Sequence, residues 1–206
     1  AEIDALSLSF ASWLQAKGMN KGDRIAQMMP NILQYTIALF GALRAGLVVV
    51  NVNPLYTQRE LQHQMSDSGA RAIVIVENFA HTLEAVLDKT DLEFEITTKI
   101  GDMHSTAKRM LTNFAVEKVK KMVPPFSIPN TTAFRDTLKT ETSAFKRPEL
   151  TLDDLAFLQY TGGTTGVAKG AMLSHGNLVH NVQQSNAWLG DHLDDGPIVG
   201  IKALPL

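Results

Sequence analysis

Short apolar runs alternate with amphipathic segments along the first half of the chain. Apolar residues at helical spacing predict a helix from Ala5 to Lys17, which Gly18 is expected to end. Uninterrupted apolar runs predict buried strands at Arg24–Met29, Leu47–Val52 and Ala72–Val76. Strands that alternate with helices at this spacing form βαβ units, so we predict an α/β fold with a largely parallel sheet.

Residues that cap helices lie between these strands. Asn31 is expected to cap the helix after the first strand, and Asn78 the helix after the third. Thr57 and Glu60 have the spacing of a capping box, which predicts a helix between the second and third strands. Four large apolar residues are assigned to the core because of their positions on the predicted helices: Trp13, Phe40, Leu43 and Met65.

A segment rich in glycine and threonine joins two further apolar runs in the second half of the chain. Residues 160–170 contain four glycines, three threonines and one lysine. Glycine allows successive N–H groups to converge on an anion, and threonine hydroxyls and a lysine add further donors and positive charge. We therefore predict that this loop binds a polyphosphate, with an ordinary surface turn as the alternative.

The loop differs from two common nucleotide-binding motifs. A Walker A loop ends in Gly-Lys-Ser/Thr, whereas here Ala168 precedes Lys169 and Gly170 follows it. A dinucleotide fingerprint needs glycine at its first, third and sixth positions, and Thr164 interrupts that pattern after Gly162. The sequence thus favours phosphate binding by a different kind of loop.

Residues 160–177 resemble the signature segment of the adenylate-forming enzymes, which include acyl-CoA synthetases, luciferases and peptide-synthetase adenylation domains. Gly162 stands where these enzymes usually have serine, and Ala168 where they usually have proline. Both departures are typical of the bacterial long-chain fatty acid–CoA ligases. Residues 21–26, 43–56 and 67–71 also resemble that family, and the resemblance is weakest at about 99–146.

The resemblance implies a reaction and a set of substrates. A fatty acid and ATP would form an acyl-adenylate, and coenzyme A would then accept the acyl group, with Mg²⁺ as the expected metal. The phosphate-binding residues that it implies are Tyr160, Thr161, Gly162, Gly163, Thr164, Thr165, Gly166, Lys169 and Gly170. Of these, Tyr160 is expected to pack under the loop, and Lys169 either to contact phosphate or to anchor the loop.

Two alternatives to the fatty acid–CoA ligase are considered. One is a relative that acts on another acid, such as a coumarate ligase, a luciferase or an adenylation domain. The other is a nucleotide-binding or membrane-interaction module without catalytic activity. No catalytic residue and no metal ligand is assigned within these 206 residues.

Composition narrows the class of protein further. The chain has 45% hydrophobic residues and a formal net charge of −2, which fits a globular domain and argues against general nucleic-acid binding. It contains no cysteine, so a disulfide framework is excluded and the acyl-accepting thiol must come from another molecule. The acidic start lacks the basic region of a signal peptide, and we expect a cytoplasmic protein.

A basic segment interrupts the α/β pattern. Residues 103–123 carry five basic side chains and one acidic side chain, interleaved with apolar residues at roughly helical spacing. Such a helix can lie on an anionic membrane, here the inner face, or can simply pack on the first domain with a solvated face. A homodimer is a further hypothesis.

The chain is expected to divide near residue 150. We assign residues 1–150 to a first α/β subdomain with a basic, proline-containing insert near 100–148, and residues 151–206 to the start of a second. Both ends of the sequence have the character of internal segments. The chain is therefore expected to be an N-terminal piece of a longer enzyme and to be inactive alone.

Overall fold

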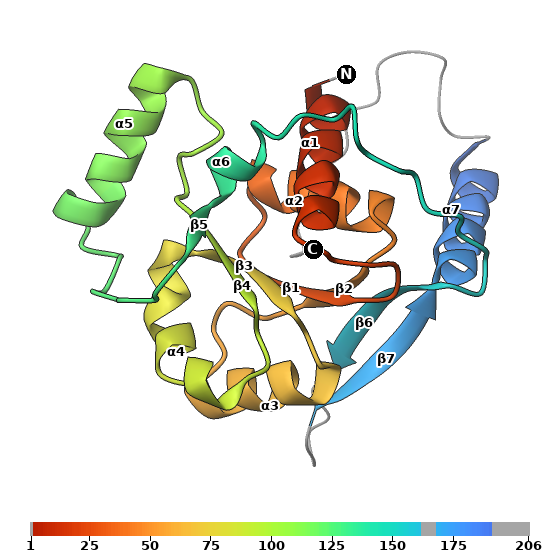
Figure 1. Cartoon of the computed structure of the whole chain (residues 1–206), viewed down its shortest axis with the longest axis horizontal. Helices are drawn as coiled ribbons and strands as arrows, with labels where there is room; N and C mark the ends of the chain where they lie inside the picture. The colour runs from red at the N-terminus through yellow and green to blue at the C-terminus, as the bar shows by residue number, and fades with distance from the viewer. Residues whose placement is uncertain (1, 162–167, 191–206) are drawn as a thin grey trace.

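The computed structural model of the chain, which describes residues 2–161 and 168–190, contains a seven-stranded sheet in the order β5-β4-β3-β1-β2-β6-β7 (Figure 1). The strands are β1 (Arg24–Met28), β2 (Val48–Asn51), β3 (Ala72–Val76), β4 (Phe94–Thr98), β5 (Thr132–Ala133), β6 (Leu155–Thr161) and β7 (Lys169–Ser174). Neighbouring strands run parallel, except for the antiparallel pair β6–β7. This confirms the predicted α/β fold with a largely parallel sheet.

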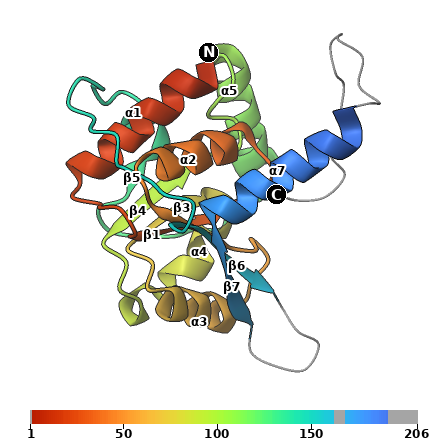
Figure 2. The same cartoon turned by 90° about the vertical axis from the view of Figure 1, so that its right-hand side faces the viewer.

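Helices cover both faces of the sheet (Figures 1 and 2). One face carries α1 (Glu2–Ala16) and α2 (Leu33–Arg44), and the other carries α3 (Gln58–Ser68) and α4 (Ala80–Glu84). The remaining helices are α5 (Thr106–Phe114), α6 (Phe134–Thr137) and α7 (His175–Leu189), and short helical turns lie at Glu77–Phe79, Leu87–Lys89 and Ala115–Val119. Both faces of a parallel sheet are thus buried, which explains its continuous apolar strands.

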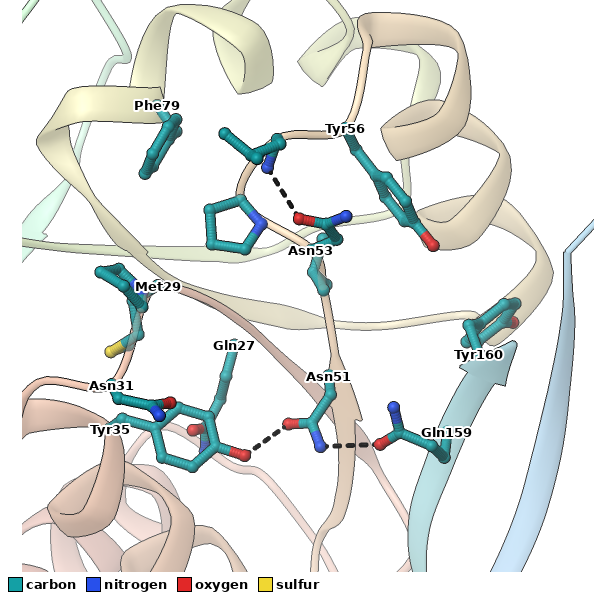
Figure 3. Close-up of a pocket in the computed structure, with 14 residues that line it drawn as sticks. Gln27, Met29, Asn31, Tyr35, Asn51, Asn53, Tyr56, Phe79, Gln159 and Tyr160 are labelled. Carbon is teal, nitrogen blue, oxygen red and sulfur yellow. Dashed lines mark hydrogen bonds between the residues drawn. The ribbon is translucent and has the colours of Figure 1, made fainter. Parts of the chain in front are cut away.

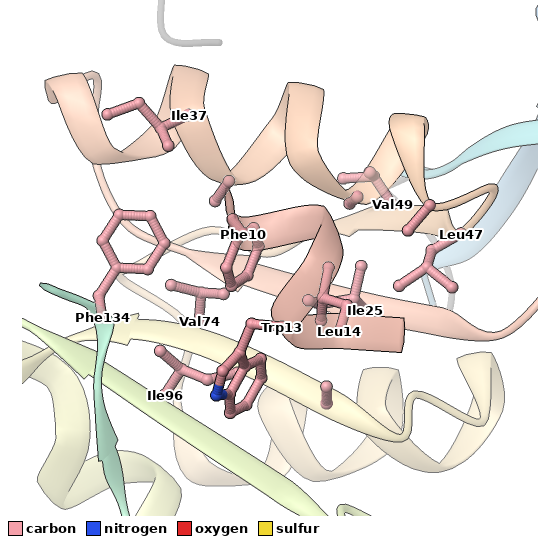
Figure 4. Packing of buried hydrophobic residues seen from close by; sticks show 14 of the residues in the cluster. Phe10, Trp13, Leu14, Ile25, Ile37, Leu47, Val49, Val74, Ile96 and Phe134 are labelled. Atoms are coloured by element: carbon pink, nitrogen blue, oxygen red, sulfur yellow. The ribbon is translucent and has the colours of Figure 1, made fainter. Parts of the chain in front are cut away.

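The larger hydrophobic cluster lies between the sheet and the pair α1–α2 (Figure 4). Phe10 is fully buried, stacks on Trp13 and meets Phe134 edge to face. Phe134 comes from α6, so the predicted basic, proline-containing insert near 100–148 also contributes to the core. Burying a side chain of this size contributes about 1.5–3 kcal/mol relative to leaving it exposed.

The predicted capping box is confirmed, and other helix ends show related features. Thr57 and Glu60 form the predicted capping box of α3, and Ser174 forms another with Asn177 at the start of α7. Gly46 and Gly69 adopt left-handed backbone angles after α2 and α3, with φ of 76° and 59°. Only glycine adopts such angles without strain, which explains why the helices end there.

Three local predictions are wrong. The N-cap of α2 is Ile32 rather than Asn31, and it makes no side-chain capping bond. Asn78 lies within a 3₁₀ turn, where its Nδ2 donates to the carbonyl of Met122 at 2.9 Å instead of capping a helix. Phe40 is 49% exposed, because α2 packs through a different stripe of residues toward α1 and the sheet.

The strand β6 joins the same sheet as the first strands and pairs with β2. At its entry, the ammonium of Lys21 lies 2.8 Å from the carboxylate of Asp154. The ion pair with Lys21 and the backbone N–H of Thr151 lower the pKa of Asp154 to about 2. The division of the chain near residue 150 remains a prediction, and the contacts here fasten the segments on either side of it to each other.

Candidate functional site

The predicted phosphate loop connects the two antiparallel strands β6 and β7. Tyr160 pairs with Gly170, and Thr161 pairs with Lys169, so the hairpin ladder extends to the last described residue before the loop. The stem therefore brings these four predicted site residues together. Five others lie outside the described residues: Gly162, Gly163, Thr164, Thr165 and Gly166.

Tyr160 forms the buried side of this stem. Its side chain is 8% exposed, and its hydroxyl donates a hydrogen bond to Oδ2 of Asp67 at 2.5 Å. Burial raises the pKa of Tyr160, and the Asp67 carboxylate raises it further, so the hydroxyl keeps its proton and acts as a donor. A Cβ atom at Gly170 would lie 3.0 Å from the Tyr160 ring, a close approach that favours a glycine opposite it.

A second contact ties the other end of the loop to the same helix. Nε2 of His63 lies 3.2 Å from the carbonyl oxygen of Ala168. His63 and Asp67 are four residues apart on α3 and thus lie on one face of that helix. Because Asp67 meets the residue before the loop and His63 the residue after it, α3 holds both ends of the stem.

Lys169 has a different environment. Lys169 is exposed, and its ammonium forms no ion pair within residues 2–161 and 168–190. A salt bridge that anchors the loop, one of the two predicted roles, is thus absent among the described residues.

A cavity of about 810 Å³ lies beside the stem, at the carboxyl ends of β1, β2 and β6 (Figure 3). Its floor contains Gln27, Asn51 and Gln159, one from each strand, and the register places Gln27 opposite Asn51 and Asn51 opposite Gln159. The hydroxyl of Tyr35 donates to Oδ1 of Asn51, and Nδ2 of Asn51 donates to Oε1 of Gln159, both at 2.9 Å. We call Gln27, Asn51 and Gln159 the amide row.

Sequence analysis did not identify His63, Asp67 or the amide row. A polar residue inside an otherwise apolar strand was a usable signal for Gln27, which interrupts the strand Arg24–Met28, and for Asn51, which ends a run of valines. The contacts of α3 with the loop stem had no such signal, because Tyr160 is 93 residues from its partner Asp67.

The basic segment forms a helix that leaves its apolar side chains exposed. No residue of α5 is buried, and Met110, Leu111 and Phe114 are 65%, 70% and 59% exposed. In Figure 1, α5 stands at the edge of the molecule beyond β5. A π-helical turn, Ala115–Val119, continues it.

An ion-pair cluster fastens this segment to the sheet. The ammonium of Lys99, just after β4, lies 3.4 Å from the carboxylate of Glu117 and 3.6 Å from that of Glu77. Burial lowers the pKa of Lys99, but the two carboxylates outweigh that effect and leave the pKa raised. Glu117, the single acidic residue of the segment, is thus already paired, which leaves the basic residues around it to dominate the exposed surface.

The described residues contain neither a cluster of metal ligands nor a helix that could cross a membrane. Within residues 2–161 and 168–190, no group of three His, Asp or Glu side chains is placed to hold a metal ion. Over the same ranges, none of the helices combines the length and the apolar character that crossing a membrane requires.

Known proteins similar to this chain share both its sequence and its fold. A long-chain-fatty-acid–CoA ligase of Escherichia coli O157:H7 is 56% identical over 207 residues, which cover 100% of this chain and 37% of the relative. A ligase of the same name from Haemophilus influenzae is 54% identical over 211 residues, with the same two coverages. The chain therefore spans little more than a third of the length of these curated relatives.

Solved structures extend the similarity. A long-chain-fatty-acid–CoA ligase from Archaeoglobus fulgidus superposes with a TM-score of 0.71 at 26% identity, over 92% of this chain and 32% of that one. An ATP-bound structure of MatB from Rhodopseudomonas palustris has the same TM-score, identity and coverages. The AMP-binding enzyme family matches residues 1–206, the whole of the sequence. The chain belongs to the AMP-binding enzyme family.

Proposed function

We propose that this chain is part of an AMP-forming long-chain fatty acid–CoA ligase, which converts a fatty acid, ATP and coenzyme A to acyl-CoA, AMP and diphosphate through an acyl-adenylate. The observation that carries this proposal is the 56% identity, over the full chain, to a long-chain-fatty-acid–CoA ligase. Relatives from three other genera, at 53–54% identity, carry the same name, which favours long-chain fatty acids over other acids as the substrate.

The loop 161–169 is proposed to bind the phosphates of ATP. Attack of a carboxylate on the α-phosphate brings negative charges together, so the site must supply positive charge and hydrogen-bond donors. The stem places Thr161 and Lys169 at the two ends of the loop, and Lys169 is exposed. In this proposal the contacts of Asp67 and His63 hold the stem, while Lys169 faces the phosphates.

Coenzyme A and Mg²⁺ complete the proposed reaction. The chain has no cysteine, so the thiol that accepts the acyl group belongs to coenzyme A. Mg²⁺ would neutralise phosphate charge when bound. No described residue cluster fits a metal site, so no ligand to it is assigned here.

A replacement chimera tests the proposed function. The segment of the E. coli O157:H7 relative that matches this chain is exchanged for residues 1–206, and acyl-CoA formation from oleate, ATP and coenzyme A is measured. We expect activity within tenfold of the relative, and a loss of at least tenfold on Lys169→Ala or Thr165→Ala, since one lost charged contact is worth roughly 1.5–3 kcal/mol. Unchanged rates in both variants would remove the phosphate assignment.

We also propose that α5 and the turn after it contact an anionic membrane on the cytoplasmic side. The support is the combination of exposed apolar side chains with five basic residues in 103–123. Apolar side chains would enter the interface while lysines and arginine meet lipid phosphates. A homodimer remains a hypothesis, which sedimentation of the purified chain would test.

Vesicle sedimentation tests the membrane contact. At low salt, the chain should co-sediment with vesicles that contain phosphatidylglycerol, and much less with neutral phosphatidylcholine vesicles. The double variant Leu111→Ser, Phe114→Ser should lose most of this binding. Leu152→Ser is the matched control, because Leu152 is also exposed, at 54%, but lies outside the segment. Equal binding by all three proteins would contradict the proposal.

A further inference from the structure

Helix α3 is fastened to the sheet along one face and at both ends. Leu61 and Met65 are buried in a hydrophobic cluster that also contains residues of β1 and β3. The capping box holds the start of the helix. At its end, Nε and Nη2 of Arg24 donate to the carbonyls of Ser68 and Gly69, at 3.0 and 2.6 Å. A helix held in this way is a rigid support for the side chains that project from it.

Two side chains of this helix reach the stem of the proposed phosphate loop. The carboxylate of Asp67 accepts a hydrogen bond from the Tyr160 hydroxyl at 2.5 Å, and Nε2 of His63 lies 3.2 Å from the carbonyl oxygen of Ala168. A carbonyl oxygen can only accept, so Nε2 of His63 carries a proton in this contact. The two hydrogen bonds therefore tie the chain on both sides of residues 161–167 to one rigid helix.

The charge of Asp67 indicates which of its properties is useful here. A carboxylate near a loop that binds phosphates repels them, and among the described residues no cation pairs with Asp67. Its side chain is exposed, and the contact that it makes in the described part of the chain is the hydrogen bond to Tyr160. We therefore expect the site to use the acceptor of Asp67 rather than its charge.

We propose that His63 and Asp67 are positioning residues for acyl-adenylate formation, which act through Ala168 and Tyr160 to set where the loop holds the phosphates of ATP. This inference rests on the proposed ligase function. Displacement of a reacting group by about 1 Å can cost roughly a hundredfold in rate, so the support of the loop affects the chemical step. Once diphosphate has left, the loop has no β- and γ-phosphates to hold. The two residues thus serve the first half-reaction and not the transfer to coenzyme A.

Separate assays of the two half-reactions in the replacement chimera test this proposal. His63→Ala and Asp67→Ala should each reduce oleate-dependent exchange between diphosphate and ATP by at least about fivefold. Both variants should still transfer the acyl group from supplied oleoyl-adenylate to coenzyme A within about twofold of the unsubstituted chimera. Loss of structure would impair both half-reactions, so the transfer assay separates it from a positioning role. Arg59→Ala is the matched control, because Arg59 is an exposed residue of α3 that makes no contact with the described part of the stem.

Conservative variants test whether the hydrogen bonds carry the effect. Asp67→Asn keeps an acceptor for Tyr160 and removes the charge, and His63→Gln keeps an N–H donor for Ala168. Both should restore exchange to within about threefold of the unsubstituted chimera. The proposal fails if both alanine variants keep the full exchange rate, if acyl transfer falls in parallel with exchange, or if the conservative variants are as slow as the alanine variants. Each of these results leaves the proposed ligase function standing, whereas an unsubstituted chimera without exchange would refute that function and this inference with it.

Discussion

The hydrogen bond between Tyr160 and Asp67 should couple the stem of the loop to α3 by a measurable free energy. We consider the substitutions Tyr160→Phe and Asp67→Ala, alone and together. A hydrogen bond to a charged group contributes roughly 1.5–3 kcal/mol. Asp67 is exposed and stays hydrated when its partner is removed, so the low end, about 1.5 kcal/mol, applies to the coupling.

A double-mutant cycle on the free energy of unfolding isolates the coupling free energy between Tyr160 and Asp67. Urea unfolding of the four proteins should give a coupling of about 1.5 kcal/mol, and Tyr160→Phe alone should lower the Tm by about 3–6 °C for a chain of this size. Tyr56→Phe is the matched control, because the structure gives the Tyr56 hydroxyl no hydrogen bond among the described residues. A coupling within about 0.3 kcal/mol of zero would refute the reasoning.

The pH dependence of this contribution follows from the pKa of Tyr160. Burial and Asp67 raise the pKa of the folded state above the unfolded value of about 10. A group whose pKa is raised on folding contributes stability that is complete below its unfolded pKa and is lost as pH rises through its folded pKa. The coupling should therefore be constant from pH 6 to 9 as far as the tyrosine is concerned, and should fall only in strong alkali.

Three other predictions concern stability and activity. Because the pKa of Asp154 is lowered to about 2, its contribution to stability should fall as pH drops below about 4 and vanish well below the folded pKa. The Tm difference between wild type and Asp154→Asn should therefore shrink over this range; a difference that stays unchanged from pH 4 down to below pH 2 would contradict the ion pair. Gly41→Val should destabilise the chain by about 1–3 kcal/mol in urea, since a Cβ atom at Gly41 would lie 2.7 Å from the ring of Phe10; an unchanged midpoint would show that α1 and α2 can separate freely. The 206-residue chain alone should form no acyl-CoA in a coupled assay, and detectable product would overturn that expectation.

Local signals predicted those features that depend on neighbouring residues. Three apolar strands and the capping box of Thr57 and Glu60 were predicted within a few residues of their observed bounds, and the phosphate loop was expected to join two apolar runs. Asn78 shows where local signals fail. Its side chain bonds to the carbonyl of Met122, 44 residues away, and a tertiary partner of this kind cannot be inferred from a capping preference.

The unpredicted parts of the site depend on register and on distant packing. The amide row exists because β1, β2 and β6 align Gln27, Asn51 and Gln159, and that register is set by the whole sheet. The short strand β5 and the buried Phe134 were missed because the surrounding prolines and polar residues favour a connector. A two-residue strand has no periodicity from which it can be predicted.

Acid-dependent exchange between labelled diphosphate and ATP in the chimera is the most direct test of the proposed ligase function. This exchange reports acyl-adenylate formation without coenzyme A and thus isolates the step that the phosphate loop is proposed to serve. Oleate should promote exchange strongly, benzoate should not, and Lys169→Ala should reduce the oleate-dependent rate at least tenfold. A folded chimera that shows no exchange with oleate, or the same exchange without any acid, would contradict the assignment.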